Sequence, residues 1–89
     1  MSTMLFDAAI SNFRSASLNP NTGDALRTIA LACQQFCAGV RDQESGQRLL
    51  FDTAISNLSN GSKQADTARV AQLLALGLQQ FCAGVKARD

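Results

Sequence analysis

Three cysteines are the residues of this chain best suited to chemistry. Cys33 and Cys37 are four positions apart, about one helical turn, and Cys82 lies far from both in sequence. Such thiols could form a redox pair, bind a metal, or hold a chromophore or another covalently attached group if one were an exposed, activated thiolate. An odd number of cysteines, with no signal peptide, indicates reduced thiols and a cytoplasmic location.

Packing is the simpler explanation for these cysteines, because cysteine is a small hydrophobe that is usually buried. Side chains one helical turn apart start ~5–6 Å apart at Cβ, whereas a disulfide requires ~3.5–4.5 Å. Two thiols without histidine make a poor zinc site, so we expect no metal and no cofactor. Cys37 and Cys82 remain the candidate reactive thiols, each followed one turn later by a basic residue, Arg41 or Lys86.

The groups that commonly carry catalysis near neutral pH are scarce. The chain contains no histidine, tryptophan or tyrosine, and its only lysines are Lys63 and Lys86. Its aspartates are scattered, and it has no glycine-rich phosphate-binding loop. We therefore expect no catalytic residue and no enzymatic activity.

The overall composition is that of a globular domain with no bias toward nucleic acid or membranes. Of 89 residues, 46% are apolar, and eight basic against seven acidic residues give a formal charge of +1. Binding to nucleic acid or an anionic membrane usually requires a basic patch, which this balance does not favour. The first ten residues lack a basic start, and Asp7 interrupts their apolar run, so no targeting segment is expected.

The chain contains an internal repeat with a period of 45 residues. LFDAAISN (5–12) matches LFDTAISN (50–57), and QQFCAGV occurs at 34–40 and again at 79–85. Residues 4–44 align with 49–89 without a gap, and 18 of 41 positions are identical. A repeat of roughly 40–47 residues commonly holds a helix pair. We therefore expect a single all-α domain over 1–89, a four-helix bundle of two tandem helix-loop-helix repeats (4–44 and 49–89) with pseudo-two-fold symmetry.

Apolar residues at helical spacing define one core face on each expected helix. On the first and third helices these residues are Leu5, Phe6, Ala9, Ile10 and Phe13, and Leu50, Phe51, Ala54, Ile55 and Leu58. On the second and fourth helices they are Ala25, Ile29, Ala32, Cys33, Phe36 and Val40, and Val70, Leu73, Leu74, Gly77, Leu78, Phe81 and Val85.

The helix ends are predicted from their capping residues. Asn21 or Thr22 is expected to cap the second helix, and Gly61 to take a left-handed conformation after the third. Gly39 and Gly84 are expected to end the second and fourth helices. The alternative is that the second helix continues past its glycine into the third, since no proline separates them.

Some repeated residues are predicted to lie outside the core. Leu31 and Leu76 fall off the apolar face, beside glutamines. They are either stray surface leucines, retained since a recent duplication, or parts of a contact patch. The candidate interaction residues are Leu31, Gln34, Gln35, Leu76, Gln79 and Gln80.

Missing catalytic groups and duplicated surface positions together favour a non-catalytic function. We expect a small helical protein–protein interaction module, acting as an adaptor, chaperone-like protein or regulatory subunit. Its expected partners are itself, as a homodimer or higher oligomer, and another protein's helix. The alternative is a thiol protein, either redox-active or carrying a covalent cofactor or chromophore, acting through Cys37 and Cys82.

Overall fold

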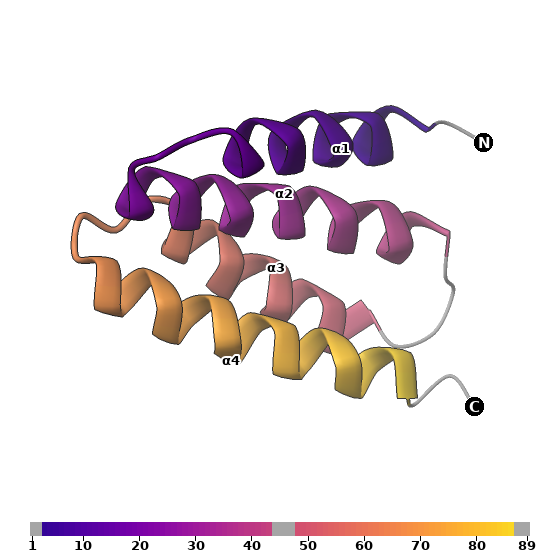
Figure 1. The fold of residues 1–89 in the computed structure, drawn as a ribbon. Coiled ribbons are helices and arrows are strands. Elements are labelled where there is room, and N and C mark those ends of the chain that lie inside the picture. The colour runs from indigo at the N-terminus through magenta and orange to yellow at the C-terminus, as the bar shows by residue number, and fades with distance from the viewer. Residues whose placement is uncertain (1–2, 44–47, 87–89) are drawn as a thin grey trace.

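Four α-helices account for nearly all of the part of the chain that the computed structural model describes, residues 3–43 and 48–86. The helices are α1 (Met4–Ser17), α2 (Thr22–Asp42), α3 (Arg48–Ser62) and α4 (Thr67–Lys86). They pack as an all-α bundle, drawn in Figure 1, whose principal extents are 38 × 25 × 18 Å. The expected fold class, an all-α four-helix bundle, is confirmed.

The helices pack in the order in which they occur along the chain. α1 packs on α2, α2 on α3 and α3 on α4, and α2 also contacts α4. Among the described helices, α1 contacts α2 alone. Figure 1 shows α1 at one edge of the bundle and α4 at the opposite edge, so each of these helices has a side that no other helix covers.

These contacts do not fit the expected pseudo-two-fold axis. Such an axis would exchange α1 with α3 and α2 with α4, so the contact between α2 and α3 would have an equal counterpart between α4 and α1. The described parts of α1 and α4 make no such contact. The two helix pairs instead lie side by side, and α2 and α3 form the junction between them.

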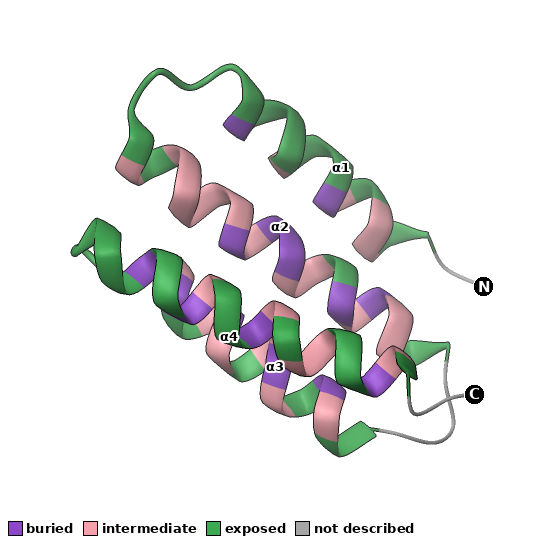
Figure 2. Cartoon of the chain, turned by 60° about the horizontal axis from the view of Figure 1, so that its bottom comes forward, coloured by how far each residue is buried: buried purple, intermediate pink, exposed green. Residues whose placement is uncertain are grey.

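The core lies mainly along α2, α3 and α4, as the burial colours of Figure 2 show. The predicted apolar faces of α3 and α4 are confirmed, because each of their residues is buried or half-buried. The prediction for α2 is wrong at Phe36, which is 41% exposed, and the prediction for α1 is wrong at two positions. Ile10 is 65% exposed and Phe13 is 40% exposed, because α1 has only one helix to pack against.

Side chains of the connecting loops cap the starts of α2 and α4. The Asn21 side chain accepts a hydrogen bond of 2.9 Å from the backbone N–H of Asp24, which confirms the cap predicted for α2. At the start of α4, the Asp66 carboxylate accepts from the backbone N–H of Ala68 at 2.9 Å. Each side chain satisfies a donor that the first helical turn would otherwise leave unpaired.

The predicted glycine stops are wrong. α2 passes Gly39 and ends at Asp42, and α4 passes Gly84 and ends at Lys86. Gly61 lies inside α3, and none of the described glycines has a positive φ. These glycines are therefore helical residues, and their role is in packing. The alternative of a continuous second and third helix concerns residues 44–47, which lie outside the described residues.

Candidate functional site

The repeated segment QQFCAGV packs the two helices of each pair together. A Cβ atom placed on Gly39 would lie 2.8 Å from Cε1 of Phe6, closer than real Cβ contacts. In the second pair, a Cβ on Gly84 would lie 3.0 Å from Cε1 of Phe51. Each glycine thus leaves the space that a phenylalanine ring from the preceding helix occupies. This explains why the segment is written twice, once for each helix pair.

Four phenylalanine rings form a row across the bundle. The ring centroids are 5.9 Å apart for Phe6 and Phe36, 5.5 Å for Phe36 and Phe81, and 5.7 Å for Phe81 and Phe51. All three contacts are tilted or edge-to-face, the geometry that aromatic pairs prefer. The outer two contacts join helices of one pair, and the middle contact joins α2 to α4.

A hydrogen bond between side chains reinforces each pair. The Asn12 amide donates to Oε1 of Gln35 at 2.7 Å, and the Asn57 amide donates to Oε1 of Gln80 at 2.7 Å. Gln35 and Gln80 were predicted to be interaction residues. The structure places both of them in contacts inside the molecule, where they join the helices of one pair.

The junction between the pairs combines an apolar centre with polar edges. Leu58 packs with Cys33 and Cys37 in a buried cluster, and Ile55 packs against it. At one edge, the Arg41 guanidinium is 3.0 Å from the Asp52 carboxylate. This ion pair raises the pKa of Arg41, mainly through the hydrogen bond to Asp52. At the other edge, Arg27 donates to the backbone carbonyl of Gln64 at 3.2 Å.

The two candidate reactive thiols lie in different environments. Cys37 is fully buried, whereas Cys82 is exposed. Burial raises the pKa of Cys37 to about 12, and the neighbouring Cys33 and Cys82 add to this shift because a second negative charge nearby is unfavourable. Cys33 is also buried, and burial raises its pKa. All three cysteines are free thiols, and no cluster of potential metal ligands occurs in residues 3–43 and 48–86.

Two exposed residues of α1 differ sharply from their counterparts in the repeat. Ile10 corresponds to Ile55, which is half-buried, and Phe13 corresponds to Leu58, which is fully buried. α3 packs against both α2 and α4, whereas α1 packs on α2 alone. The apolar side chains that α3 buries against the preceding pair are therefore exposed on α1.

One side of α4 is also exposed where the corresponding side of α2 is covered. Five residues of α2 at helical spacing are buried or half-buried, whereas the five corresponding residues of α4 are all exposed. These are Leu26, Ala30, Gln34, Cys37 and Arg41 on α2, and Ala71, Ala75, Gln79, Cys82 and Lys86 on α4. We call the second set the α4 outer stripe.

Only part of the predicted interaction patch is at the surface. Leu76 is 40% exposed and Gln79 is exposed, both on α4. Leu31 and Gln34, at the matching positions of α2, are half-buried. Of the predicted residues, Leu76 and Gln79 are therefore at the surface, whereas Gln80 and the three residues of α2 are half-buried.

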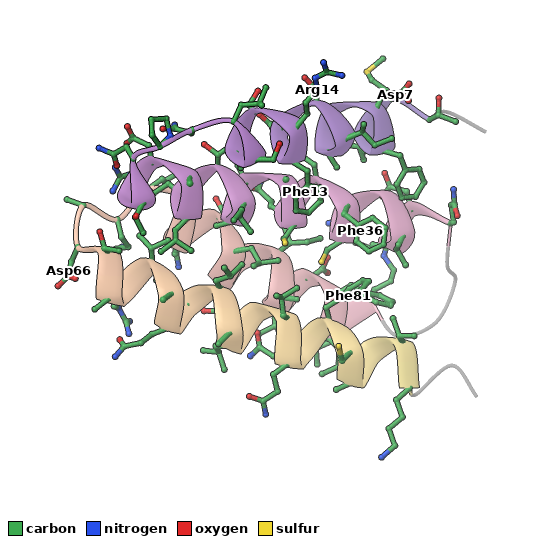
Figure 3. The ribbon with its side chains drawn as sticks, in the orientation of Figure 1. Asp7, Phe13, Arg14, Phe36, Asp66 and Phe81 are labelled. Atoms are coloured by element: carbon green, nitrogen blue, oxygen red, sulfur yellow. The ribbon has the colours of Figure 1, made fainter. Side chains whose placement is uncertain are left out.

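Apolar spacing does not predict the exposure of Ile10 and Phe13 on α1. Figure 3 shows Phe13 on α1, Phe36 on α2 and Phe81 on α4 in that order down the molecule, and Phe13 and Phe36 are about equally exposed, at 40% and 41%. Apolar spacing assigns all three to the core, which is right for the half-buried Phe81 and wrong for Phe13 and Phe36. Apolar spacing within one helix carries no information on which other helices cover it, so it gave no signal for this exposure.

Comparison with protein-family models, curated proteins and solved structures finds no match to this chain. None of the described helices combines the length and the apolar character needed to cross a lipid bilayer. The function is therefore inferred from the surfaces and buried groups described above.

Proposed function

We propose that this protein is a non-catalytic helical interaction module that associates with copies of itself. Its cellular role would be that of an adaptor, a chaperone-like protein or a regulatory subunit in the cytoplasm. The observation that carries the proposal is the uncovered apolar side of α1, where Ile10 is 65% exposed. The matching residue of α3, Ile55, is half-buried against the core cluster. Association would remove this apolar surface from water.

We further propose that residues 4–44 and 49–89 are two structural repeats that stack like successive units of a repeat protein. Matched contacts support this proposal: each pair has the same asparagine–glutamine hydrogen bond of 2.7 Å and the same phenylalanine ring against a helical glycine. Repeat units bury their apolar faces against their neighbours, and terminal units normally carry a polar outer face. On the exposed side of α1, the apolar residues Met4, Ile10 and Phe13 lie among polar ones.

The buried groups favour a non-catalytic role. The side chains at the centre of the junction are aliphatic or thiol groups, and the thiol of Cys37 has a pKa of about 12 because it is buried. A thiol is a useful nucleophile only as the thiolate, so Cys37 is unsuited to catalysis near neutral pH. Its role is packing.

A thiol function is the second candidate, and it now rests on Cys82 alone. Cys82 is the one exposed thiol among the three cysteines. A single exposed thiol suits covalent attachment of a group better than a redox pair, because a redox pair would need a second accessible sulfur. Labelling of Cys82, described below, tests the accessibility that this function requires.

Thermal unfolding at several protein concentrations tests self-association. If the folded chain binds a second copy, the midpoint of unfolding rises with protein concentration by mass action. We expect this rise over about a hundredfold range of concentration, and its loss in Ile10→Asp, which places a charge in the proposed contact. Leu49→Asp is the matched control, because Leu49 is 79% exposed and lies on α3, outside the uncovered sides of α1 and α4. A midpoint that is independent of concentration in the unmodified chain contradicts self-association.

A further inference from the structure

We propose that copies of this chain associate head to tail, with α1 of one copy packed on the outer stripe of α4 of the next. In this contact, α1 of one copy takes the place of α3, and α4 of the next copy takes the place of α2, as these two helices pack within the molecule. This inference rests on the proposed self-association and adds its geometry. The partner is a second copy of this chain, and the two contacting surfaces differ from each other.

The internal contact between α2 and α3 serves as the template. α4 corresponds to α2 in the repeat, since both contain QQFCAGV, and α1 corresponds to α3, since both contain the LFD and AISN segments. Within the molecule, α2 is followed by α3, the helix that corresponds to α1. No helix follows α4 within the described residues, so the surface that receives such a helix is uncovered.

The surface of α4 carries the same residue types as the template at its centre. Ala30 of α2 lies 3.8 Å from the position that a Cβ of Gly61 would take, and Cys37 packs with Leu58. The corresponding residues of the α4 outer stripe are Ala75 and Cys82, both exposed. These small side chains allow a second helix to approach closely, as α3 approaches α2.

The surface of α1 carries the matching apolar residues. Ile55 and Leu58 supply the apolar contact of α3 with the cysteine cluster of α2. On α1 the same positions hold Ile10 and Phe13, which are 65% and 40% exposed. Two exposed hydrophobic residues on the equivalent face provide the apolar centre that a contact between copies needs.

The charges also match. Arg41 of α2 pairs with Asp52 of α3 at 3.0 Å, and the corresponding residues are Lys86 of α4 and Asp7 of α1, both exposed. Asp7 lies near the start of α1, at the end of the bundle where α4 finishes, and Asp66 lies at the opposite end (Figure 3). A copy of α1 placed antiparallel on α4 would therefore bring Asp7 close to Lys86 of its neighbour.

Contact between two different surfaces leaves one of each free at the ends of the assembly. Such contacts produce rings when the rotation closes and open chains when it does not. Phe13 is larger than Leu58, and Leu78 is larger than Cys33, so the contact between copies has bulkier side chains than its internal template. We expect it to be weaker than the internal contact and to depend on concentration.

Mixing two variants, each blocked at one end, tests this geometry. Ile10→Asp blocks the α1 surface and Cys82→Arg blocks the α4 outer stripe, and both positions are exposed, so the fold should be retained. Each variant alone should associate at least about thirtyfold more weakly than the unmodified chain, as for a central interface residue. The mixture should form a one-to-one dimer and nothing larger, because one intact α1 surface then meets one intact α4 surface. Sedimentation velocity of each variant and of the mixture measures this.

A charge exchange provides the second test. Asp7→Lys should weaken association by up to about fivefold, as expected for an exposed ion pair, and Lys86→Glu combined with it should restore the affinity. Asp42→Lys is the matched control, because Asp42 is an exposed acid on α2 outside both surfaces.

The outcomes separate this inference from the proposed function. If each blocked variant is monomeric and their mixture also stays monomeric, the contact is not between α1 and α4. The head-to-tail geometry is then wrong although the chain self-associates. If the unmodified chain is itself monomeric at every concentration, both proposals are wrong. Recovery of the dimer on mixing, with the unmodified chain forming larger species, supports the inference.

Discussion

At the scale of single residues, two cysteines with the same neighbours in sequence differ in burial because of their positions in the fold. Cys37 and Cys82 stand in identical seven-residue segments, yet one is fully buried and the other exposed. The difference arises because α3 packs over the stripe of α2 that contains Cys37, whereas no described helix covers the matching stripe of α4. Local sequence therefore says little about the chemistry of either thiol.

Thiol labelling of the native protein tests this difference. In dilute protein, where the proposed contact between copies is dissociated, we expect a maleimide at about pH 7 to modify Cys82 quickly. Cys33 and Cys37 should react only after denaturation, because burial limits access and raises the pKa of both buried thiols. Intact-mass spectrometry against time counts the labels, and Cys82→Ser is the control that should remain unlabelled. Rapid modification of Cys37 in the native chain would show that the junction between the helix pairs is not packed as described.

Substitution of a helical glycine tests the close packing of α3 and α4. A Cβ on Gly77 would lie 2.6 Å from Cγ of Leu58 and 3.2 Å from the backbone oxygen of Ala54. Gly→Ala in a helix normally gains about 1 kcal/mol, but crowding of a buried side chain costs about 1–3 kcal/mol. Leu58 is fully buried and has little room to move, so crowding should win.

We therefore expect Gly77→Ala to lower the free energy of unfolding by up to about 2 kcal/mol, measured by urea denaturation. Gly39→Ala is the comparison, because the crowded Phe6 ring is only half-buried and is able to shift. Its loss should be smaller, below about 1 kcal/mol. A gain in stability for Gly77→Ala would mean that the two helices are further apart than the structure places them.

At the scale of elements, the helices were predictable from the sequence and their partners were not. Apolar spacing and the Asn21 cap located the four helices, because both are local properties of the chain. Whether Ile10 and Phe13 are buried depends on whether another helix covers α1, and no local sequence pattern contains that information. The predicted helix ends at Gly39 and Gly84 are wrong for a related reason. These glycines leave room for phenylalanine rings of other helices and do not end their own helices.

The arrangement predicts that α1 is the least protected helix. It packs against α2 alone, whereas α2 is flanked by α1, α3 and α4. Local opening is easiest where fewest buried contacts are lost. In hydrogen exchange of the dilute protein, the amides of α1 should exchange fastest and those of the buried part of α2 slowest.

High protein concentration provides the control for this experiment. If association covers α1, its exchange should slow as concentration rises, while exchange in α2 changes little. Equal protection of α1 and α2 in dilute solution would contradict the edge position of α1.

At the scale of the whole molecule, the described helices leave one side of α1 and one side of α4 uncovered. Stacked repeats usually need three or more units, with polar terminal faces, to be stable and soluble on their own. This chain has two repeats in sequence, an exposed apolar face on α1 and a stripe of small exposed residues on α4. The proposed association with further copies would cover these surfaces, and this links the fold to the proposed function.

The most direct measurement of this account is the weight-average mass in solution, determined by light scattering across a dilution series of the unmodified chain. The account predicts a mass that approaches 9.5 kDa only at high dilution and rises with concentration to two or more copies. Because the proposed surfaces are different, the rise should continue past the dimer unless a ring closes. A mass that stays at 9.5 kDa at every concentration would contradict the account, since the uncovered side of α1 would then not be used by a second copy.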